Sequence, residues 1–442
     1  MKLTGTLIRS TIVAALGGLL FGFDTAVIAG TTADLTRSFS LSDFQLGWTV
    51  AVALMGTVIG AATASFPGDR YGRRDSLRVL AVLYLISALG CGFAWNWGSL
   101  LIFRFIGGLG IGGSSVLGPM YIAEIAPAKW RGRLVGLFQF NIVVGILLAY
   151  LSNYLIGLGH FGLSEWRWML GVSGIPALFF FLMLFGIPRS PRWLMTKRRA
   201  EEARQVLVQI GEPNVDQEVE DIRASIDAEH GHAKEPLFMR KYRLPIMLAI
   251  TIGVFNQLSG INAVLYYLND IFARAGFSKV SGDLQAVLIG FTNLVFTVIA
   301  MSIIDKVGRK TLLLIGAVGC AICLGGVSAV FLTNSHERWL VWLLVGFIAS
   351  FAFSQGAVIW VYLSEVFPNR VRAKGQSLGS FTHWIMNFGI SFLFPIVAGV
   401  SRGAPFVFFC SMMILQFFVV LFLYPETKGH TLEDMQRRLG IA

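Results

Sequence analysis

Twelve apolar stretches constrain the fold of this chain more than any other feature of the sequence. A helix needs about 20 predominantly apolar residues to cross a bilayer. The stretches lie near residues 8–30, 45–66, 77–96, 99–123, 134–157, 167–187, 245–272, 284–304, 311–332, 339–364, 375–399 and 404–424. The ten-residue alternation of membrane barrels is absent, which leaves helices as the spanning structure. The sequence therefore predicts an all-α integral membrane protein with twelve transmembrane helices.

The composition excludes several other classes of protein. Hydrophobic residues make up 55% of the 442 and charged residues only 14%, whereas soluble domains carry about 25% charged residues. We therefore exclude a soluble enzyme, a coiled coil, a collagen and a disordered chain. The Cys320-x-x-Cys323 pair has no nearby His or acidic partner. We interpret it as two small buried hydrophobes and not as a redox or metal site, and we expect no metal and no cofactor.

The positions of the basic residues predict the orientation of the chain in the membrane. If both termini are cytoplasmic, the cytoplasmic segments hold 29 of the 36 Lys and Arg residues, the external loops hold six, and Arg104 lies within a span. This bias follows the positive-inside rule. The net charge of +11 therefore reports topology in a lipid bilayer and not nucleic-acid binding. We expect a multi-pass, monomeric protein of the cytoplasmic (inner) membrane with both termini inside.

The chain divides into two similar halves joined by a polar linker. Residues 190–241 are charged and weakly amphipathic, which predicts short cytoplasmic helices. We interpret them as a solvated linker, with a regulatory partner surface as the alternative. The predicted domains are residues 1–189, the linker 190–241, and residues 242–442 with a short cytoplasmic tail.

Three motifs recur in both halves at nearly equal offsets. Asp69-Arg-Tyr-Gly-Arg-Arg74 matches Asp305-Lys-Val-Gly-Arg-Lys310, offset by 236 residues. The Tyr-x-x-Glu-x-x-Pro motifs that begin at Tyr121 and Tyr362 are offset by 241, and the motifs at Pro188 and Pro425 by 237. A six-span unit duplicated in parallel is a transporter architecture, with the substrate site between the halves near the membrane midplane.

These motifs, with others, make the chain similar to the sugar porter branch of the major facilitator superfamily. The further matches are Gly17-Gly-Leu-Leu-Phe-Gly-Phe-Asp24, Arg104-Phe-x-Gly-Gly-Leu-Gly-x-Gly112, Pro188-Arg-Ser-Pro-Arg-Trp-Leu194, Gln257-Leu-Ser-Gly-Ile-Asn262 and Pro425-Glu-Thr-Lys-Gly429. That branch includes bacterial sugar–proton symporters and animal facilitative glucose transporters. The resemblance implies the major facilitator fold and transport of a sugar.

The resemblance also assigns a role to the charged residues of the cytoplasmic loops. In the family they form networks that lock the cytoplasmic side when the protein faces outward. A cluster of ion pairs that is whole in one state and broken in the other makes a bistable gate. The alternative is that these charges only set topology. The predicted gate residues are Asp69, Arg73, Arg74, Glu124, Arg131, Asp305, Arg309, Glu365 and Arg372, with Glu124/Arg131 and Glu365/Arg372 expected as pairs.

Two charged residues within the spans are the candidates for proton coupling. A charge at the bilayer centre costs at least a few kcal/mol. Asp24 and Arg104 both lie roughly 8–9 Å below the external surface at 1.5 Å rise per residue, so we expect a salt bridge. The matching positions in proton-coupled relatives are such a pair, and facilitative relatives lack the acid. The alternative is a static structural ion pair.

A second set of polar residues near mid-membrane is neutral and rich in amides. Carboxamides donate and accept hydrogen bonds as sugar hydroxyls do, and indole faces stack on sugar rings. A single such residue would more often join two helices. By the resemblance, Tyr266 and Tyr267 form an extracellular gate. The predicted substrate residues are Gln139, Gln257, Asn262, Asn293, Trp360, His383, Trp384 and Asn387.

Four positions depart from the family pattern. Asn256 replaces a Gln, His383 stands where Asn or Gln is common, Ala357 replaces a helix-bending Pro and leaves Gly356 as the breaker, and Arg189 replaces a Glu. His383 either titrates or only forms hydrogen bonds.

The predicted function is proton-coupled symport of a monosaccharide, a hexose or a pentose, by alternating access. The alternatives are a facilitative uniporter and a transporter-like sugar sensor. No nucleophile–base set or phosphate loop supports an enzyme.

Overall fold

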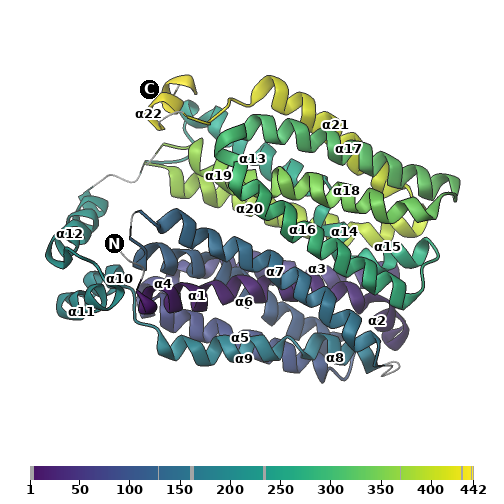
Figure 1. Ribbon diagram of the computed structural model, residues 1–442, viewed down its shortest axis with the longest axis horizontal. Helices are drawn as coiled ribbons and strands as arrows, with labels where there is room; N and C mark the ends of the chain where they lie inside the picture. Colours follow the sequence, from purple (N-terminus) through teal and green to yellow (C-terminus); the bar gives the residue numbers. More distant parts are fainter. Residues whose placement is uncertain are drawn as a thin grey trace. The chain divides into compact units, whose positions relative to one another are not determined.

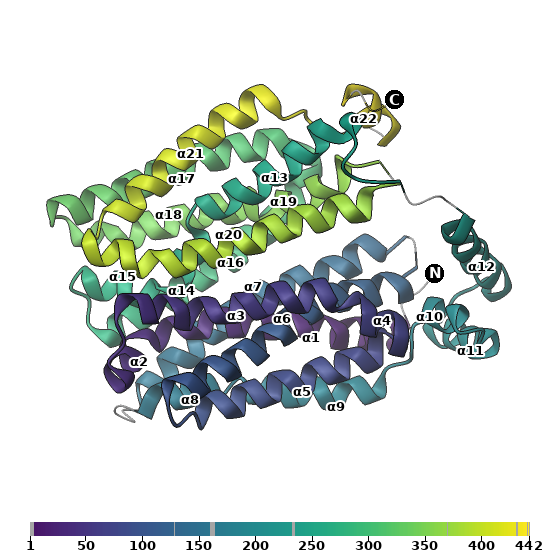
Figure 2. The same ribbon diagram turned by 180° about the vertical axis from the view of Figure 1, so that it is seen from behind.

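The computed structural model is all-helical in the residues that it describes, which are 4–127, 129–159, 164–231, 235–368, 370–429, 432–439 and 441. Twelve helical segments in this part of the chain are long and apolar enough to cross a membrane. They correspond to the twelve predicted stretches, so the predicted fold class is confirmed. Figures 1 and 2 show the helices from two opposite sides.

Before the linker, the helices are α1 (Gly5–Val27), α2 (Thr32–Phe39), α3 (Asp43–Thr63), α4 (Ser65–Tyr71), α5 (Arg73–Gly92), α6 (Trp97–Ile125), α7 (Arg131–Gly157), α8 (Glu165–Gly171) and α9 (Gly174–Met183). The linker forms α10 (Pro191–Thr196), α11 (Ala200–Ile210) and α12 (Val215–Gly231). After it come α13 (Arg243–Leu258), α14 (Ile261–Tyr266), α15 (Leu268–Arg274), α16 (Lys279–Val307), α17 (Arg309–Thr333), α18 (Leu340–Phe353), α19 (Gln355–Glu365), α20 (Arg372–Val400), α21 (Ala404–Leu423) and α22 (Leu432–Arg438).

The chain forms two compact units whose limits differ from the predicted domain limits. Unit 1 comprises Met1–Val27, Val52–Ser152 and Ser164–Ala233, and unit 2 comprises Ile28–Ala51, Asn153–Leu163 and Lys234–Ala442. Unit 2 therefore includes α2 and the first part of α3 together with all the helices that follow the linker. The predicted boundaries at residues 190 and 242 stay a prediction.

Glycines let the helices of unit 1 pack backbone against backbone. A Cβ on Gly22 of α1 would lie 1.9 Å from the carbonyl oxygen of Ile142, and one on Gly145 of α7 would lie 2.1 Å from that of Leu19. Gly108 and Gly112 of α6 approach α3 in the same way. Small residues of this kind allow close helix packing in membranes. The glycine-rich run of α6 is thus a packing surface, as its position within a span predicts.

Two spans of unit 2 are broken, one where no break is predicted and one close to the predicted breaker Gly356. Gly260 has a φ of +80° and separates α13 from α14; a left-handed residue of this kind ends a helix readily only as glycine. Ser354 separates α18 from α19, two residues before the predicted breaker Gly356. The Ser354 hydroxyl donates to the carbonyl of Ser350 at 2.6 Å, which competes with the regular backbone pattern. In Figure 1, α13, α14 and α15 follow one another as separate segments.

The linker folds as short helices, as its composition predicts. Ser190 caps α10 by accepting a hydrogen bond from the backbone N–H of Trp193, and Pro191 occupies the first turn. The linker is attached to the first span, because the Thr4 hydroxyl donates to the carbonyl of Ile210 at 2.9 Å.

Candidate functional site

The helix break at Gly260 brings two of the predicted substrate residues into contact. The Asn262 amide donates to Gln257 Oε1 at 2.9 Å. The Gln257 amide in turn donates to Asn256 Oδ1 at 3.1 Å. Gln257 is fully buried, and Asn262 is half-buried. A continuous helix would carry these side chains along its own axis, so the break is what creates a compact cluster of carboxamides.

His383 of α20 completes this cluster and joins it to two indole rings. Both ring nitrogens of His383 lie 3.3 Å from Gln257 Nε2. The imidazole centroid is 5.2 Å from the ring of Trp360 and 5.1 Å from that of Trp384. Trp360 is 38% exposed and Trp384 only 6%. The Trp360 ring therefore offers an accessible apolar surface beside groups that donate and accept hydrogen bonds.

Asn387 links the same helix to the two tyrosines that are predicted to gate the site. Its amide donates to the Tyr266 hydroxyl at 3.2 Å, and its oxygen accepts from the Ser391 hydroxyl at 3.0 Å. The Tyr267 hydroxyl donates to the carbonyl of Ser391 at 2.9 Å. Both tyrosines are buried. Their hydroxyls thus join the end of α14 to α20, and a role of the two tyrosines as a gate stays a prediction.

Two predicted substrate residues lie apart from these contacts. Asn293 of α16 belongs to unit 2 and is 7% exposed. Gln139 of α7 is half-buried and belongs to unit 1. Their participation in one site with Gln257 stays a prediction.

Asp24 and Arg104 lie in unit 1, near enough for their charges to interact. Asp24 is half-buried on α1, and Arg104 is only 4% exposed on α6. One turn along α6, Gly107 faces them: a Cβ there would lie 3.8 Å from Asp24 Oδ2 and 2.4 Å from Ser87 Oγ. The absence of a side chain at Gly107 therefore leaves room for Ser87, while Asp24 lies at ordinary contact distance from this position. A direct salt bridge between Asp24 and Arg104 stays a prediction.

A network of charges in unit 1 centres on Arg73. Its guanidinium contacts Asp69 at 2.9 Å and Glu124 at 2.9 Å, and it donates to the carbonyl of Gly68 at 2.8 Å. Glu124 also accepts a hydrogen bond from the Ser190 hydroxyl. The side chains of Arg73 and Glu124 are about nine-tenths buried. This network ties the start of α5 to the end of α6 and to the start of the linker.

Unit 2 contains a matching network centred on Arg309. Its guanidinium contacts Asp305 and Glu365, each at 2.9 Å, and donates to the carbonyl of Ile304 at 3.2 Å. Glu365 accepts a hydrogen bond from the Thr427 hydroxyl at 2.6 Å. Each partner of Arg309 corresponds to a partner of Arg73 at the offsets found in the sequence.

The tyrosines of the repeated motifs also make equivalent contacts. The Tyr121 hydroxyl donates to the carbonyl of Pro188 at 2.7 Å, and the Tyr362 hydroxyl donates to that of Pro425 at 3.3 Å. Equivalent tyrosines of the two halves thus make equivalent hydrogen bonds to the backbone.

Several predicted gate residues have partners that differ from the expected ones. Glu124 and Glu365 contact Arg73 and Arg309, while Arg131 is exposed and Arg372 donates to the carbonyl of Phe367 at 3.4 Å. The expected pairs lie seven residues apart, on the two sides of one short loop, whereas the observed pairs join residues that are 51 and 56 positions apart in the sequence.

Asp75 forms ion pairs with three further basic residues of unit 1. It pairs with Arg74 at 3.0 Å, with Arg78 at 2.8 Å and with Arg189 at 3.1 Å. Arg189, which departs from the family pattern, therefore has an acidic partner in this chain.

Sequence reasoning missed the hydroxyl groups of Ser190 and Thr427. Both follow a proline by two residues, in Pro188-Arg-Ser190 and Pro425-Glu-Thr427, and both hold the repeated glutamate. It also missed Glu426, which accepts from the backbone N–H groups of Arg309 and Lys310 at 2.9 and 3.1 Å. The offset of 237 residues between the two proline motifs, which is close to the offsets of the other repeats, was the signal that could have identified these hydroxyls.

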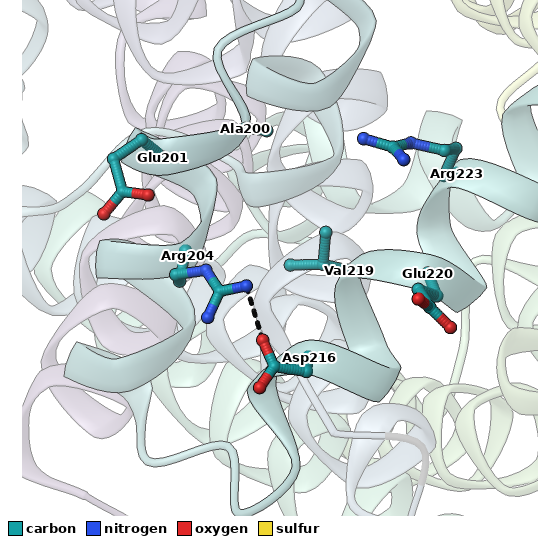
Figure 3. A pocket seen from close by; sticks show the side chains of 7 residues that line it. All are labelled: Ala200, Glu201, Arg204, Asp216, Val219, Glu220 and Arg223. Atoms are coloured by element: carbon teal, nitrogen blue, oxygen red, sulfur yellow. Dashed lines mark ion pairs between the residues drawn. The ribbon is translucent and has the colours of Figure 1, made fainter.

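A pocket of about 340 Å³ lies in the linker, apart from all the predicted site residues. Figure 3 shows its lining, in which Arg204 pairs with Asp216 and charges of both signs mix. Among the described residues, no group of three or more His, Cys, Asp or Glu could hold a metal ion. The polar cluster around Gln257 combines hydrogen-bond donors and acceptors with an exposed indole ring, which makes it the candidate for a small-molecule site.

Comparison with known proteins identifies the family of the chain. The model of the family described as "Sugar (and other) transporter" matches residues 10–439. The D-xylose-proton symporter of Escherichia coli is 38% identical over 96% of this chain and 94% of its own length. The arabinose-proton symporter of Bacillus subtilis is 37% identical over 98% and 95%.

Solved structures are similar over the whole chain. The inward open conformation of the xylose transporter XylE from E. coli superimposes with a TM-score of 0.88 at 37% identity, covering 98% of this chain and 99% of that chain. The same symporter bound to 6-bromo-6-deoxy-D-glucose superimposes with a TM-score of 0.80 at 36% identity, covering 99% and 100%.

Proposed function

Because this chain belongs to the sugar transporter family of the major facilitator superfamily, we propose that it carries a monosaccharide together with a proton across the cytoplasmic membrane by alternating access. Its relatives are sugar–proton symporters and glucose transporters, so the predictions of a sugar porter and of a carrier in place of an enzyme are confirmed. The protein is an integral membrane protein with twelve spans.

The observation that carries the proposal is the neutral cluster of Gln257, Asn262 and His383 beside Trp360. Each carboxamide donates and accepts, as does a neutral imidazole, which matches the paired roles of a sugar hydroxyl. The indole face suits the C–H face of a pyranose ring. Asn293, Trp384, Asn387 and, from unit 1, Gln139 supply the remaining contacts in this proposal.

Asp24 is the proposed proton carrier, and Arg104 is its counter-charge. Burial in a membrane favours the neutral acid, whereas a nearby guanidinium favours the carboxylate. Because these two influences oppose each other, a small change in the access of water to Asp24 is enough to change its protonation state. Sugar binding then permits the loaded, neutral carrier to close.

The gates complete the cycle. Tyr266 and Tyr267 close the external side, and the Arg73 and Arg309 networks, with Arg74, Arg131 and Arg372, act on the cytoplasmic side. Both termini and the linker face the cytoplasm, in keeping with the distribution of Lys and Arg. The carrier acts as a monomer within the lipid bilayer.

Substitution of Asp24 tests the coupling. Asp24→Asn mimics the protonated acid, so we expect sugar binding and exchange to persist while sugar-driven proton uptake disappears. The measurement is sugar-dependent alkalinisation of the medium around weakly buffered cells that express the protein. Alkalinisation at the wild-type level in the Asn variant would exclude Asp24 as the coupling acid.

Wild-type behaviour separates the rival functions. A uniporter would equilibrate labelled sugar without alkalinisation, and a sensor would bind sugar without moving it. A thermal-shift screen of the purified protein with pentoses and hexoses would identify the sugar, because a ligand that binds only the folded state raises its stability.

A further inference from the structure

The short helix α2, which follows the first span, is held to the C-terminal half of the chain by polar contacts within unit 2. Asp34 of α2 accepts from Lys279, at the start of α16, over 2.9 Å. The Thr32 hydroxyl lies close enough to the carboxyl group of Asp270 in α15 to lower the pKa of that group. Two neighbouring residues of one short helix thus contact two different helices of the other half.

The burial of these groups is uneven. The Asp34 side chain is only 5% exposed, whereas that of Lys279 is 42% exposed. The Lys279 side chain is the more exposed partner, so the desolvation cost of forming the pair falls mainly on Asp34. Because the cation is partly exposed, the attraction within this pair is screened more than in a fully buried pair.

The contact between Thr32 and Asp270 is also incompletely satisfied. Asp270 Oδ2 is buried and has no hydrogen-bond partner among the described residues. The Thr32 hydroxyl also lies 3.2 Å from the carbonyl of Ala29, and one hydroxyl proton serves one acceptor at a time. An unsatisfied buried carboxyl oxygen lowers the stability of the closed arrangement.

An aromatic contact accompanies the polar one. Phe44 and Trp48 of α3 pack edge-on against Phe392 of α20, with ring centroids 5.2 and 5.8 Å apart. These contacts also lie within unit 2. The outer ends of the first two spans are therefore joined to the C-terminal half by apolar as well as charged groups.

We propose that Thr32, Asp34, Asp270 and Lys279 form an outer latch, which holds the external end of the first span against the seventh and eighth and must open before sugar enters from outside. The proposal rests on the proposed function, because alternating access requires contacts between the two halves on the external side to break and reform. It adds four residues that lie outside the sugar cluster and the cytoplasmic networks.

Accessibility of a buried cysteine on α2 measures the state of the latch. Leu35 of α2 is fully buried, so a cysteine introduced by Leu35→Cys reacts with a membrane-impermeant maleimide only when α2 lifts away. Intact cells are labelled from outside, and the same cells without Leu35→Cys report the reaction of the four native cysteines.

In this background, Lys279→Met and Asp34→Asn should each raise the labelling rate by up to about tenfold, because each removes one charge of a partly buried pair. Asp34→Asn keeps the shape of the side chain. It therefore still tests the latch if the Lys279→Met protein misfolds. The matched control is Arg338→Met, since Arg338 is an exposed cation of the external 3₁₀ turn Glu337–Trp339.

Unchanged labelling in both latch variants would overturn the proposal, as would an equal rise in the Arg338→Met control. Labelling that occurs only in inverted vesicles would overturn the orientation and with it the outer latch. Sugar uptake by the wild-type protein is measured separately. Loss of the proposed function would therefore appear in uptake, whereas failure of the latch would appear in labelling.

Discussion

Arg309 holds Glu365 with two hydrogen bonds, from Nε at 3.2 Å and from Nη2 at 2.9 Å. Arg73 makes the equivalent contact with Glu124 in the other unit. Each arginine lies at the start of one helix and its glutamate at the end of another. The hydrogen bonds between them therefore break only if the two helices move relative to each other. We therefore expect both pairs to influence the rate at which the carrier changes state.

Glu365→Gln should lower the maximal rate of sugar uptake severalfold and leave sugar affinity within about twofold. Gln keeps the shape of the side chain but removes a charge-assisted bond, which contributes about 1.5–3 kcal/mol when buried and less here, because Glu365 is 25% exposed. Asp305→Asn is the control, since Asp305 is 82% exposed. Uptake of labelled sugar and calorimetric binding measure the two effects. Equal losses in both variants would argue against a specific role for Glu365.

His383→Gln should keep transport but change the order of preference among sugars. The imidazole contacts Gln257 and lies between two indole rings, so its replacement moves a hydrogen-bonding group within the cluster. Competition of a pentose and hexose panel against labelled uptake gives the order. The same order in both proteins would make His383 a structural residue only.

Gly260→Ala should destabilise the protein and weaken sugar binding. An added Cβ would lie 2.3 Å from Phe409 Cδ2, and Gly260 has a φ of +80°. Gly276→Ala is a matched control, because Gly276 has a φ of +87° but no atom within 4 Å of the added Cβ. The control loses only the roughly 1–2 kcal/mol of left-handed backbone strain. Thermal unfolding in detergent should therefore show the larger drop for Gly260→Ala, and equal drops would show that the contact with Phe409 relaxes freely.

The outer latch should open more readily as pH rises. Burial raises the pKa of Asp270 to about 6, although the Thr32 hydroxyl and Arg274 act to lower it. An acid with a raised pKa is most favourable in its buried position when protonated, so the closed arrangement loses stability as pH rises above the ordinary value near 3.9 and through about 6. The other charged groups of α2 and of the first turns of α16 are Asp34, Arg37, Lys279 and Asp283.

The measurement is labelling of the Leu35→Cys protein at pH 5.5 and at pH 7.5. We expect faster labelling at the higher pH in the parent, after correction for the reactivity of a free thiol, and little change with pH in Asp270→Asn. The same pH dependence in both would assign the effect to another group.

The sequence predicted features that depend on local composition and on repetition. Twelve spans follow from apolar length, and the Arg73 and Arg309 networks lie at the repeated motifs. The pairing within those networks did not follow, because Arg73 meets Glu124 only after two spans have folded side by side, whereas Arg131 is nearby in sequence and exposed. The break in the tenth span was predicted at Gly356 and lies two residues earlier, at Ser354, whose hydroxyl donates to the carbonyl of Ser350.

The glycine contacts of unit 1 also bear on leakage. Gly22 and Gly145 bring α1 and α7 together at the backbone, and Gly108 and Gly112 do the same for α6 against α3. At these four glycines the backbones lie too close together to admit a water molecule between them. A file of water along these seams would let protons cross without sugar and dissipate the membrane gradient. We expect these close helix contacts to keep water away from Asp24, so that protons reach Asp24 only along the route that opens for the sugar.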